Sequence, residues 1–439
     1  MDVRGMRRFA LAVPLAAALL VGCGVNPVTG RQELQFVSEN EELQLGQQNY
    51  GPNRQAEGGD FGVDPALTQY VREVGQKLAA VADRKLPYEF TVVNNSVPNA
   101  WALPGGKIAV NRGLLPQLRN EAELAAVLGH EIVHAAARHG AKAQERGTLL
   151  QAGMAAAQIG VAVAGANGGL TDLALQGAGA GAQMVQMKYG RDQELEADHY
   201  GMVYMKRAGY DLGAAVSLQQ TFVRLAQGHN QSWLEGLFAS HPPSAERVER
   251  NQATLQELGG GKGEVGAERF AARTASLRKM QPAYDKYDQA MAAAGKKDFA
   301  TARRLAGEAA QMLPREARFS QLQGDLAMAQ KQPSEALGFY QKAIDLDGSY
   351  FGSYLGGGVA QYKLGNRAKA EEWLKKSANL LPTASAVYYL GSIAKERGDV
   401  AGARQLFQAV AGAQNEYGQM ATAELTRLDQ AQNAAPFQP

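Results

Sequence analysis

The sequence lacks the features that several large classes of protein require. Its 439 residues contain a single cysteine, Cys23, so no intramolecular disulfide can stabilise the fold. The formal net charge is only +2, and no basic segment interleaved with aromatic residues is present, which argues against a nucleic-acid partner. A composition that is 45% hydrophobic and 20% charged is instead typical of a globular protein, and the length allows two or three domains.

The N-terminus has the pattern of a secretory signal. Arginines precede the apolar run 9–21, which is too short to span a membrane comfortably. Residues 20–23 resemble the bacterial lipobox, which implies cleavage before Cys23 and its acylation, with enough acyl chains for stable anchoring. Gly24 follows, and by resemblance to sorting in Gram-negative lipoproteins this implies the periplasmic face of the outer membrane. We therefore expect residues 1–22 to be a lipoprotein signal peptide; an ordinary signal peptide with an incidental cysteine is the alternative.

The motif with the clearest chemistry is the HExxH sequence at residues 130–134. Apolar residues around it recur with a helical period, so His130 and His134 project from one helix face about a turn apart, where two neutral imidazoles can bind one Zn²⁺. Glu131 lies about 100° further round the helix, where it can take a proton from a bound water. The alternative is chance, and for a chain with only six histidines we estimate a random HExxH at roughly one in two hundred.

A catalytic zinc needs a third protein ligand, and the segment 194–198 can supply it. On a helix Glu194 and Asp198 share a face, whereas Glu196 points nearly the opposite way. We therefore predict that Glu194 is the third ligand and that Asp198 accepts an imidazole N–H and fixes the tautomer of a ligating histidine. The histidines that we do not expect to bind metal are His139, roughly 140° round the helix from His134, and the surface residues His199 and His229.

Upstream of the HExxH helix, residues 30–84 are predicted to be helical, apart from a polar, glycine-rich connection over 51–64. Short strands are predicted just before that helix. Residues 88–93 and 107–111 alternate and are rich in β-branched and aromatic residues, with turn-forming residues 104–106 between them. An exposed sheet edge here would hold an extended peptide substrate, and a plain hairpin packed on the helix fits the spacing equally well.

The segment 149–187 is rich in glycine and alanine. Its glycines argue against an uninterrupted membrane helix, and either a lid over the site or a buried helical hairpin fits this composition.

The C-terminal part of the chain repeats itself. Small residues recur in two series with steps of 34, 34 and 33 residues: Ala302, Ala336, Ala370 and Ala403, and Ala290, Gly324, Gly358 and Gly391. This period is the signature of tetratricopeptide repeats, so we predict four repeats over 283–429 that form a right-handed stack of helix pairs. The glycine-rich stretch before them suggests a linker over 257–282, and residues 430–439 form a tail. The concave face is predicted to hold a peptide or protein; a purely structural solenoid is the alternative.

Three motifs in register resemble the zinc metallopeptidases that include the CAAX prenyl proteases and the bacterial HtpX and BepA enzymes. They are HExxH, Glu194-x-x-x-Asp198 and the segment 99–106. The resemblance implies a mainly α fold with a small β-sheet, in which a gluzincin-type metallopeptidase domain over 23–256 is followed by the α-solenoid of repeats. Because the chain lacks the spanning helices of the membrane-embedded members, the soluble periplasmic branch fits best.

The same resemblance assigns the site. One Zn²⁺ per chain is expected on His130, His134 and Glu194, with Glu131 as general base. The residues expected to border the substrate cleft are Asn99, Ala100, Pro104, Gly105 and Gly106.

Residues 240–247 also match the family, which places His241 near the metal and Arg247 on the following helix. His241 would either donate a hydrogen bond to the developing oxyanion or act as a fourth ligand that keeps the enzyme latent. Arg247 is the other expected catalytic donor to the oxyanion. Taken alone, the residues are also compatible with a loop histidine before an ordinary helix start.

These observations predict a membrane-anchored periplasmic zinc metalloendopeptidase that acts on proteins or unfolded polypeptides. By resemblance, it would serve quality control or assembly of outer-membrane proteins, and the repeats would bring in substrate or dock on the assembly machinery. The alternative is a chaperone-like adaptor with latent protease activity that binds envelope proteins through its repeats. Zinc content and cleavage distinguish these functions.

Overall fold

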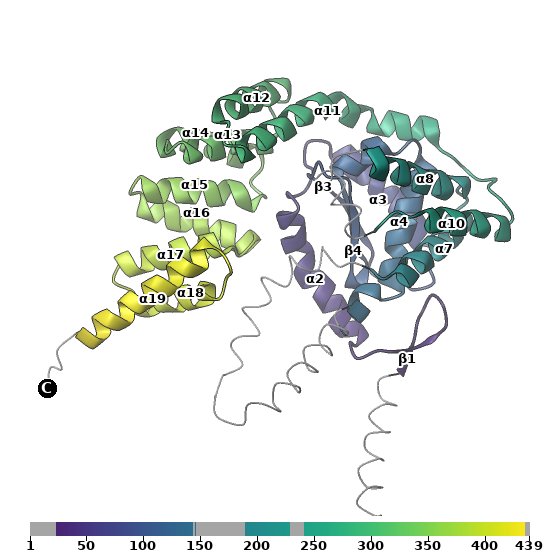
Figure 1. Ribbon diagram of the computed structural model, residues 1–439, viewed down its shortest axis with the longest axis horizontal. Coiled ribbons are helices and arrows are strands. Elements are labelled where there is room, and N and C mark those ends of the chain that lie inside the picture. Colours follow the sequence, from purple (N-terminus) through teal and green to yellow (C-terminus); the bar gives the residue numbers. More distant parts are fainter. Residues whose placement is uncertain (1–22, 144, 146–188, 229–240, 435–439) are drawn as a thin grey trace, which may run out of the picture.

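The computed structural model describes residues 23–143, 145, 189–228 and 241–434 (Figure 1). The predicted signal peptide, the Gly- and Ala-rich segment 149–187 and His229 lie outside the described residues, so those predictions are not tested. Each helix within the described ranges is too short or too polar to cross a bilayer.

A small mixed sheet forms one layer of the N-terminal domain. Its order is β3-β5-β4, with β5 (Lys107–Asn111) parallel to β3 (Glu89–Val93) and antiparallel to β4 (Ala100–Leu103). The two predicted strands therefore pair, but in parallel, so the alternative of a plain hairpin is wrong. The turn before β5 is the short 3-10 helix η1 (Pro104–Gly106), where Gly105 and Gly106 adopt positive φ angles of 75° and 83° that favour glycine.

The helix that carries the HExxH motif, α4 (Glu121–Ala136), lies at the centre of the domain and is buried along its whole length. It begins where the side chain of Asn120 accepts a hydrogen bond from the backbone N–H of Glu123. Around the sheet and α4 lie η2 (Arg112–Gln117), α2 (Glu39–Ala56), α3 (Pro65–Ala79), α7 (Arg191–Arg207), α8 (Gly213–Gly228) and α10 (Ala245–Glu257). The main core is continuous from α3 through α4 to α7 and α8.

Two N-terminal elements differ from the expected helices and loops. Residues 51–64 are not simply a polar connection, because α2 continues through Pro52 to Ala56. Its buried positions Gly46, Tyr50 and Asn53 extend along one face, and the Tyr50 hydroxyl donates to the Ile108 carbonyl at 3.0 Å, so tertiary contacts outweigh the local cost of proline. Upstream, an antiparallel hairpin of β1 (Cys23–Val25) and β2 (Gln32–Leu34) occupies part of the segment predicted to be helical.

The C-terminal half contains the predicted helix pairs. Small residues of the repeat meet large side chains of the next helix: a Cβ on Gly324, Gly358 or Gly391 would lie 2.8 Å from Tyr340, Leu374 or Phe407 respectively. The pairs are α11 (Ala267–Gly295) with α12 (Phe299–Met312), α13 (Ala317–Ala329) with α14 (Pro333–Leu346), α15 (Phe351–Lys363) with α16 (Arg367–Leu380), and α17 (Ala384–Glu396) with α18 (Val400–Ala411), followed by α19 (Glu416–Ala434). The repeats curve away from α11, and α16 returns to contact α2 (Figure 1).

The predicted linker over 257–282 is wrong from Ala267 onward. Helix α11 runs unbroken through this segment into the first repeat. Phe270, Leu277 and Tyr284 recur every seven residues and are buried in the core of the N-terminal domain, which explains why the segment is helical. The Tyr284 ring lies under the Arg112 guanidinium at 3.4 Å, and its hydroxyl donates to Glu316 of the repeats. One helix therefore belongs to both parts of the molecule.

Candidate metal centre

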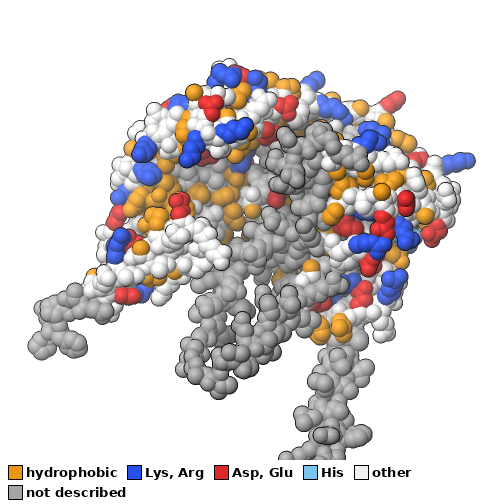
Figure 2. All heavy atoms as spheres, in the orientation of Figure 1, with side chains coloured by type: hydrophobic (Ala, Val, Ile, Leu, Met, Phe, Trp, Pro, Cys, Tyr) orange, Lys and Arg blue, Asp and Glu red, His pale blue; other side chains and the backbone are white. Residues whose placement is uncertain are grey.

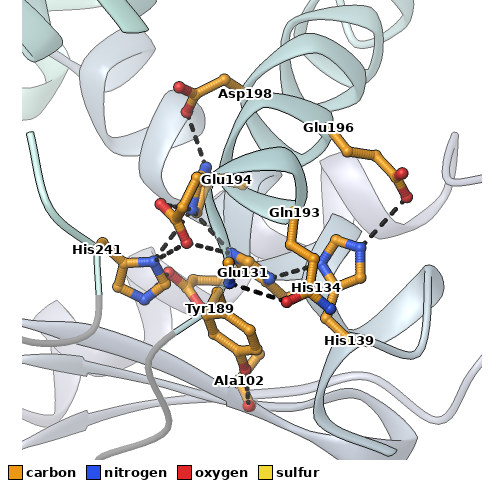
Figure 3. Close-up of polar contacts among 12 residues, drawn as sticks. Ala102, Glu131, His134, His139, Tyr189, Gln193, Glu194, Glu196, Asp198 and His241 are labelled. Carbon is orange, nitrogen blue, oxygen red and sulfur yellow. Dashed lines mark hydrogen bonds and ion pairs between the residues drawn. The ribbon is translucent and has the colours of Figure 1, made fainter. Parts of the chain in front are cut away.

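Four buried side chains from three parts of the chain converge on one point: His130 and His134 from α4, Glu194 from α7, and His241 just before α10. Figure 3 shows His134, Glu194 and His241 directed toward one another. One ligand atom of each lies within 4.8 Å of the others. The Nε2 atom of His130 is 3.0 Å from His134 Nε2 and 3.2 Å from His241 Nδ1, which in turn is 3.0 Å from Glu194 Oε1. Three imidazoles and a carboxylate in this arrangement can hold a divalent metal ion such as zinc.

The charges around the point fit a cation. Three buried carboxyl groups, those of Glu131, Glu194 and Asp198, lie around it, and the guanidinium of Arg247 pairs with the last two. Beside this point, Glu131 Oε2 and His241 Nε2 are buried and have no hydrogen-bond partner among the described residues. Buried polar atoms are rarely left in this state unless a water or an ion serves them. The donor set and the surrounding charge therefore fit a divalent cation such as zinc.

Helices α4 and α7 come together through glycine. A Cβ on Gly129 would lie 3.1 Å from the Gly201 carbonyl oxygen, and a Cβ on Gly201 would lie 3.1 Å from the backbone nitrogen of His130. Because no side chain separates the helices here, their backbones touch directly beside the first histidine. This contact brings Glu194, two turns earlier on α7, within reach of both histidines.

The Asp198 carboxylate lies beside His130, with its Oδ1 2.9 Å from His130 Nδ1. When Asp198 accepts a hydrogen bond from Nδ1–H, the Nε2 lone pair of His130 is directed at the cluster. Burial alone would raise the pKa of Asp198, but the charge and hydrogen bonds of Arg247 outweigh burial and hold the pKa below its ordinary value. The carboxylate is therefore ionised and suited to orient the imidazole.

Arg247 contacts two carboxylates of the centre. Its Nε and Nη2 atoms donate to both Asp198 oxygens at 2.7 Å, and Nη1 lies 2.8 Å from Glu194 Oε2 and donates to the Pro242 carbonyl at 3.2 Å. The buried guanidinium therefore positions the Asp198 and Glu194 side chains. Its expected role as a donor to a substrate oxyanion stays a prediction.

A second series of side-chain contacts, which the sequence did not indicate, lies behind the His134 ring. His134 Nδ1 is 2.8 Å from His139 Nδ1, and His139 Nε2 is 3.2 Å from Glu196 Oε1 (Figure 3). Glu196 Oε1 also accepts a hydrogen bond from Asn26 at 3.1 Å. If His134 donates from Nδ1, its Nε2 is left free to bind metal. His139 is thus not among the four residues of the cluster, but it lies directly behind one of them.

The direction predicted for His139 on a continuous helix is wrong, because α4 ends at Ala136 and Arg138 takes a left-handed conformation, with φ of 62°. That turn redirects the chain, so the angle expected on a continuous helix does not apply. Nothing in the local sequence signals a left-handed arginine, whose guanidinium is held by Glu42. His199, expected at the surface, is half-buried, and its Nδ1 lies 3.2 Å from the Thr254 hydroxyl.

Burial shifts the pKa values of two groups of the centre, His134 and Glu131. It lowers the pKa of His134 well below the ordinary value, which keeps that imidazole neutral as a ligand must be. It raises the pKa of the Glu131 carboxyl, which suits a group that must both accept and return a proton. Glu131 Oε1 lies 3.5 Å from His241 Nε2, and a cavity of about 40 Å³ adjoins both residues and His130.

The predicted substrate edge lies next to the cluster. Strand β4, which contains Ala100, is an outer strand of the three-stranded sheet, whereas the opposite strand, β3, is bridged by Asp60. Asn99 precedes β4 and the residues of η1 follow it, and all of them are buried. Tyr189, which the sequence did not single out, links this strand to the centre: its ring stacks on His134 at 3.8 Å and its hydroxyl lies 3.4 Å from the Ala102 carbonyl.

A histidine pair and a general-base glutamate on one helix, with a carboxylate from a second helix, define the class of HExxH metallopeptidases. Residues 65–255 match the model of Peptidase family M48. Mitochondrial metalloendopeptidase OMA1 of Schizosaccharomyces pombe is 32% identical over 254 residues, which cover 55% of this chain and 71% of that protein. The chain belongs to peptidase family M48.

Two relatives from Escherichia coli strain K12 are also similar. Metalloprotease YcaL is 33% identical over 183 residues, which cover 40% of this chain and 67% of that protein. The beta-barrel assembly-enhancing protease is 33% identical over 196 residues, which cover 43% of this chain and 39% of that protein. The chain thus spans about two fifths of the length of the assembly-enhancing protease that it matches.

Proposed function

We propose that this protein is a zinc metalloendopeptidase that hydrolyses peptide bonds in proteins or unfolded polypeptides. The observation that carries the proposal is the convergence of His130, His134 and Glu194 on one buried point, with Glu131 beside it. One Zn²⁺ per chain would be held by the two histidines and Glu194. When bound, zinc acts as a Lewis acid and lowers the pKa of an attached water towards about 7.

The remaining steps belong to residues of the chain. Glu131 takes a proton from the attacking water at its free oxygen, Oε2, and returns it to the amine nitrogen as the peptide C–N bond breaks. Asp198 and His139 hold the rings of His130 and His134 in the tautomers that direct Nε2 inward. The edge of β4 would align the substrate backbone as an added strand, with Asn99, Ala100 and residues 104–106 at its border.

His241 is proposed as a fourth group on the metal that keeps the enzyme latent, rather than as a donor to the oxyanion. Its Nδ1 lies as close to His130 Nε2 and Glu194 Oε1 as the other ligand atoms lie to one another, which supports a ligand role. A ligand in the water position blocks hydrolysis until it moves. On this proposal His241→Ala increases cleavage, whereas the loss of an oxyanion donor would decrease it.

Location and substrates are proposed from sequence and similarity. Cleavage before Cys23 and its acylation would anchor the enzyme at the periplasmic face of the outer membrane. One relative is named a beta-barrel assembly-enhancing protease, which supports outer-membrane proteins in assembly or quality control as substrates. The repeats would hold those proteins or dock on the assembly machinery.

The test combines metal content with cleavage of casein and of unfolded porin by the mature protein. We expect about one zinc per chain, cleavage by the wild type, and faster cleavage by His241→Ala. Absence of zinc would show that the site assignment is wrong. Bound zinc without cleavage by either protein would favour the adaptor, with the repeats as its working surface.

A further inference from the structure

The N-terminal hairpin of β1 and β2 has one strongly apolar outer face. Three large hydrophobic side chains on it are about half exposed: Val25 at 54%, Leu34 at 50% and Phe36 at 53%. In the register of the hairpin Cys23 pairs with Leu34 and Val25 with Gln32, so Val25 and Leu34 share a face, and Phe36, two residues beyond Leu34, continues it. Hydrophobic side chains lie at the lower edge of the molecule near this hairpin (Figures 1 and 2).

The opposite face of the hairpin is bound to the peptidase domain by an ion pair and hydrogen bonds. Glu33 forms an ion pair with Lys142, and Arg138 donates to the side chain of Gln35. The backbone N–H groups of residues 36 and 37 donate to the Glu145 carboxylate at 2.9 and 2.8 Å. These contacts fix which face of the hairpin looks outward, so the apolar face stays exposed unless something outside the domain covers it.

The position of Cys23 indicates what covers this face. Paired residues of antiparallel strands have Cα atoms about 5 Å apart, and two residues along a strand span about 7 Å. If Cys23 carries lipid chains embedded in a bilayer, its pairing partner Leu34 and its near neighbour Val25 lie at the same bilayer surface. The interfacial layer of a bilayer accepts apolar and aromatic side chains.

We propose that the hairpin docks the peptidase domain on the membrane, with Val25, Leu34 and Phe36 in the interfacial layer beside the acylated Cys23. This inference rests on the lipid anchoring proposed above. The acyl chains hold the protein at the membrane, and the hairpin fixes its orientation. Since Asn26 of the hairpin donates to Glu196 behind His139 and His134, the metal centre lies at a fixed height above the lipid.

The test uses a unique thiol. Acylation consumes the thiol of Cys23, the only cysteine, so Leu34→Cys introduces a single reactive site in the mature lipoprotein. We would label it with the fluorophore NBD and reconstitute the protein in phosphatidylethanolamine and phosphatidylglycerol vesicles. The matched control is Leu346→Cys, which labels an exposed leucine of the repeats. We expect a blue-shifted emission at position 34 and several-fold slower reduction by aqueous dithionite than at position 346.

Equal reduction rates at the two positions would overturn the inference. If shielding of position 34 occurs without vesicles and grows with protein concentration, a second copy covers the face and the inference is also wrong. The mass of the N-terminal peptide and flotation with vesicles test the anchoring separately. An acylated, floating protein with an accessible label at position 34 refutes the docking alone, whereas an unacylated protein refutes both.

Discussion

The metal centre and the helical repeats bury their residues in opposite ways. In the repeats, a large apolar side chain packs against a glycine of the preceding helix, as Leu374 packs against Gly358. At the metal centre, polar side chains are crowded together in the interior, and burial shifts the pKa values of His134 and Glu131 in opposite directions. Each packing contact in the repeats adds to the stability of the fold. At the metal centre, burying charged groups lowers that stability but gives the groups the shifted pKa values that catalysis uses.

The comparison predicts that substitutions in the two regions separate function from stability. At the centre they should alter catalysis or metal binding while the fold persists. In the repeats they should alter the free energy of unfolding while metal binding persists.

The largest effect is expected for Glu131→Gln. The amide keeps the shape of the side chain but cannot accept a proton, so the rate of peptide hydrolysis should fall by about a thousandfold. Zinc content and melting temperature should stay near the wild-type values. Asp192→Asn, an exposed carboxyl on α7, is the control and should cleave normally. A Glu131→Gln protein that still cleaves at the wild-type rate would remove Glu131 from the mechanism.

His139→Ala should weaken metal binding by about 10- to 100-fold, because His134 loses the partner of its Nδ1 atom. Competition with a chromophoric chelator measures the zinc dissociation constant directly. His199→Ala is the matched control, since His199 lies on α7 and contacts Thr254 rather than a ligand. Equal affinities for the two variants would show that the contact behind His134 has no effect on the metal.

Gly358→Val should lower the free energy of unfolding by about 1–3 kcal/mol, because the new side chain overlaps Leu374 in a closely packed contact. The midpoint of urea denaturation should fall while the zinc dissociation constant stays unchanged. A loss of zinc affinity in this variant would instead couple the repeats to the centre and weaken the contrast between the two regions.

The smallest effect is expected for Gly338→Ala, on the exposed side of α14. Nothing lies within 4 Å of the new methyl group, so the change removes only backbone freedom from the unfolded chain. We expect the free energy of unfolding to rise by about 0.5–1 kcal/mol. The same urea titration measures it, and a decrease would mean that α14 is packed more tightly on that side than its contacts indicate.

The sequence was most informative where neighbours in the chain are also neighbours in space. The spacing of His130 and His134 placed both on one helix face, and the 34-residue step located the small residues at the helix crossings. In both cases one regular helix converts sequence distance into direction. Strands β3 and β5 followed from their residue types. Strand β4 was not predicted, and the parallel pairing of β3 with β5 depends on a crossover through β4 that alternation does not encode.

The sequence failed where contacts between distant segments decide the conformation. Arg138 adopts a left-handed conformation and pairs with Glu42, and this turn carries His139 behind His134. Pro52 remains inside α2 because Tyr50 and Asn53 are buried on either side of it. Arg247 was expected near the metal from resemblance alone, but its role depends on Asp198 and Glu194, which reach it only in the folded chain.

The contact between Gly129 and Gly201 has a consequence for the choice of metal. It sets the separation of the two helices that carry the histidines and Glu194, and a methyl group at either position would force its neighbours apart by a few tenths of an ångström. Protein ligands to a given metal hold their distances within about 0.2 Å. The size of ion that this site accepts is therefore determined partly by two hydrogen atoms that never touch the ion.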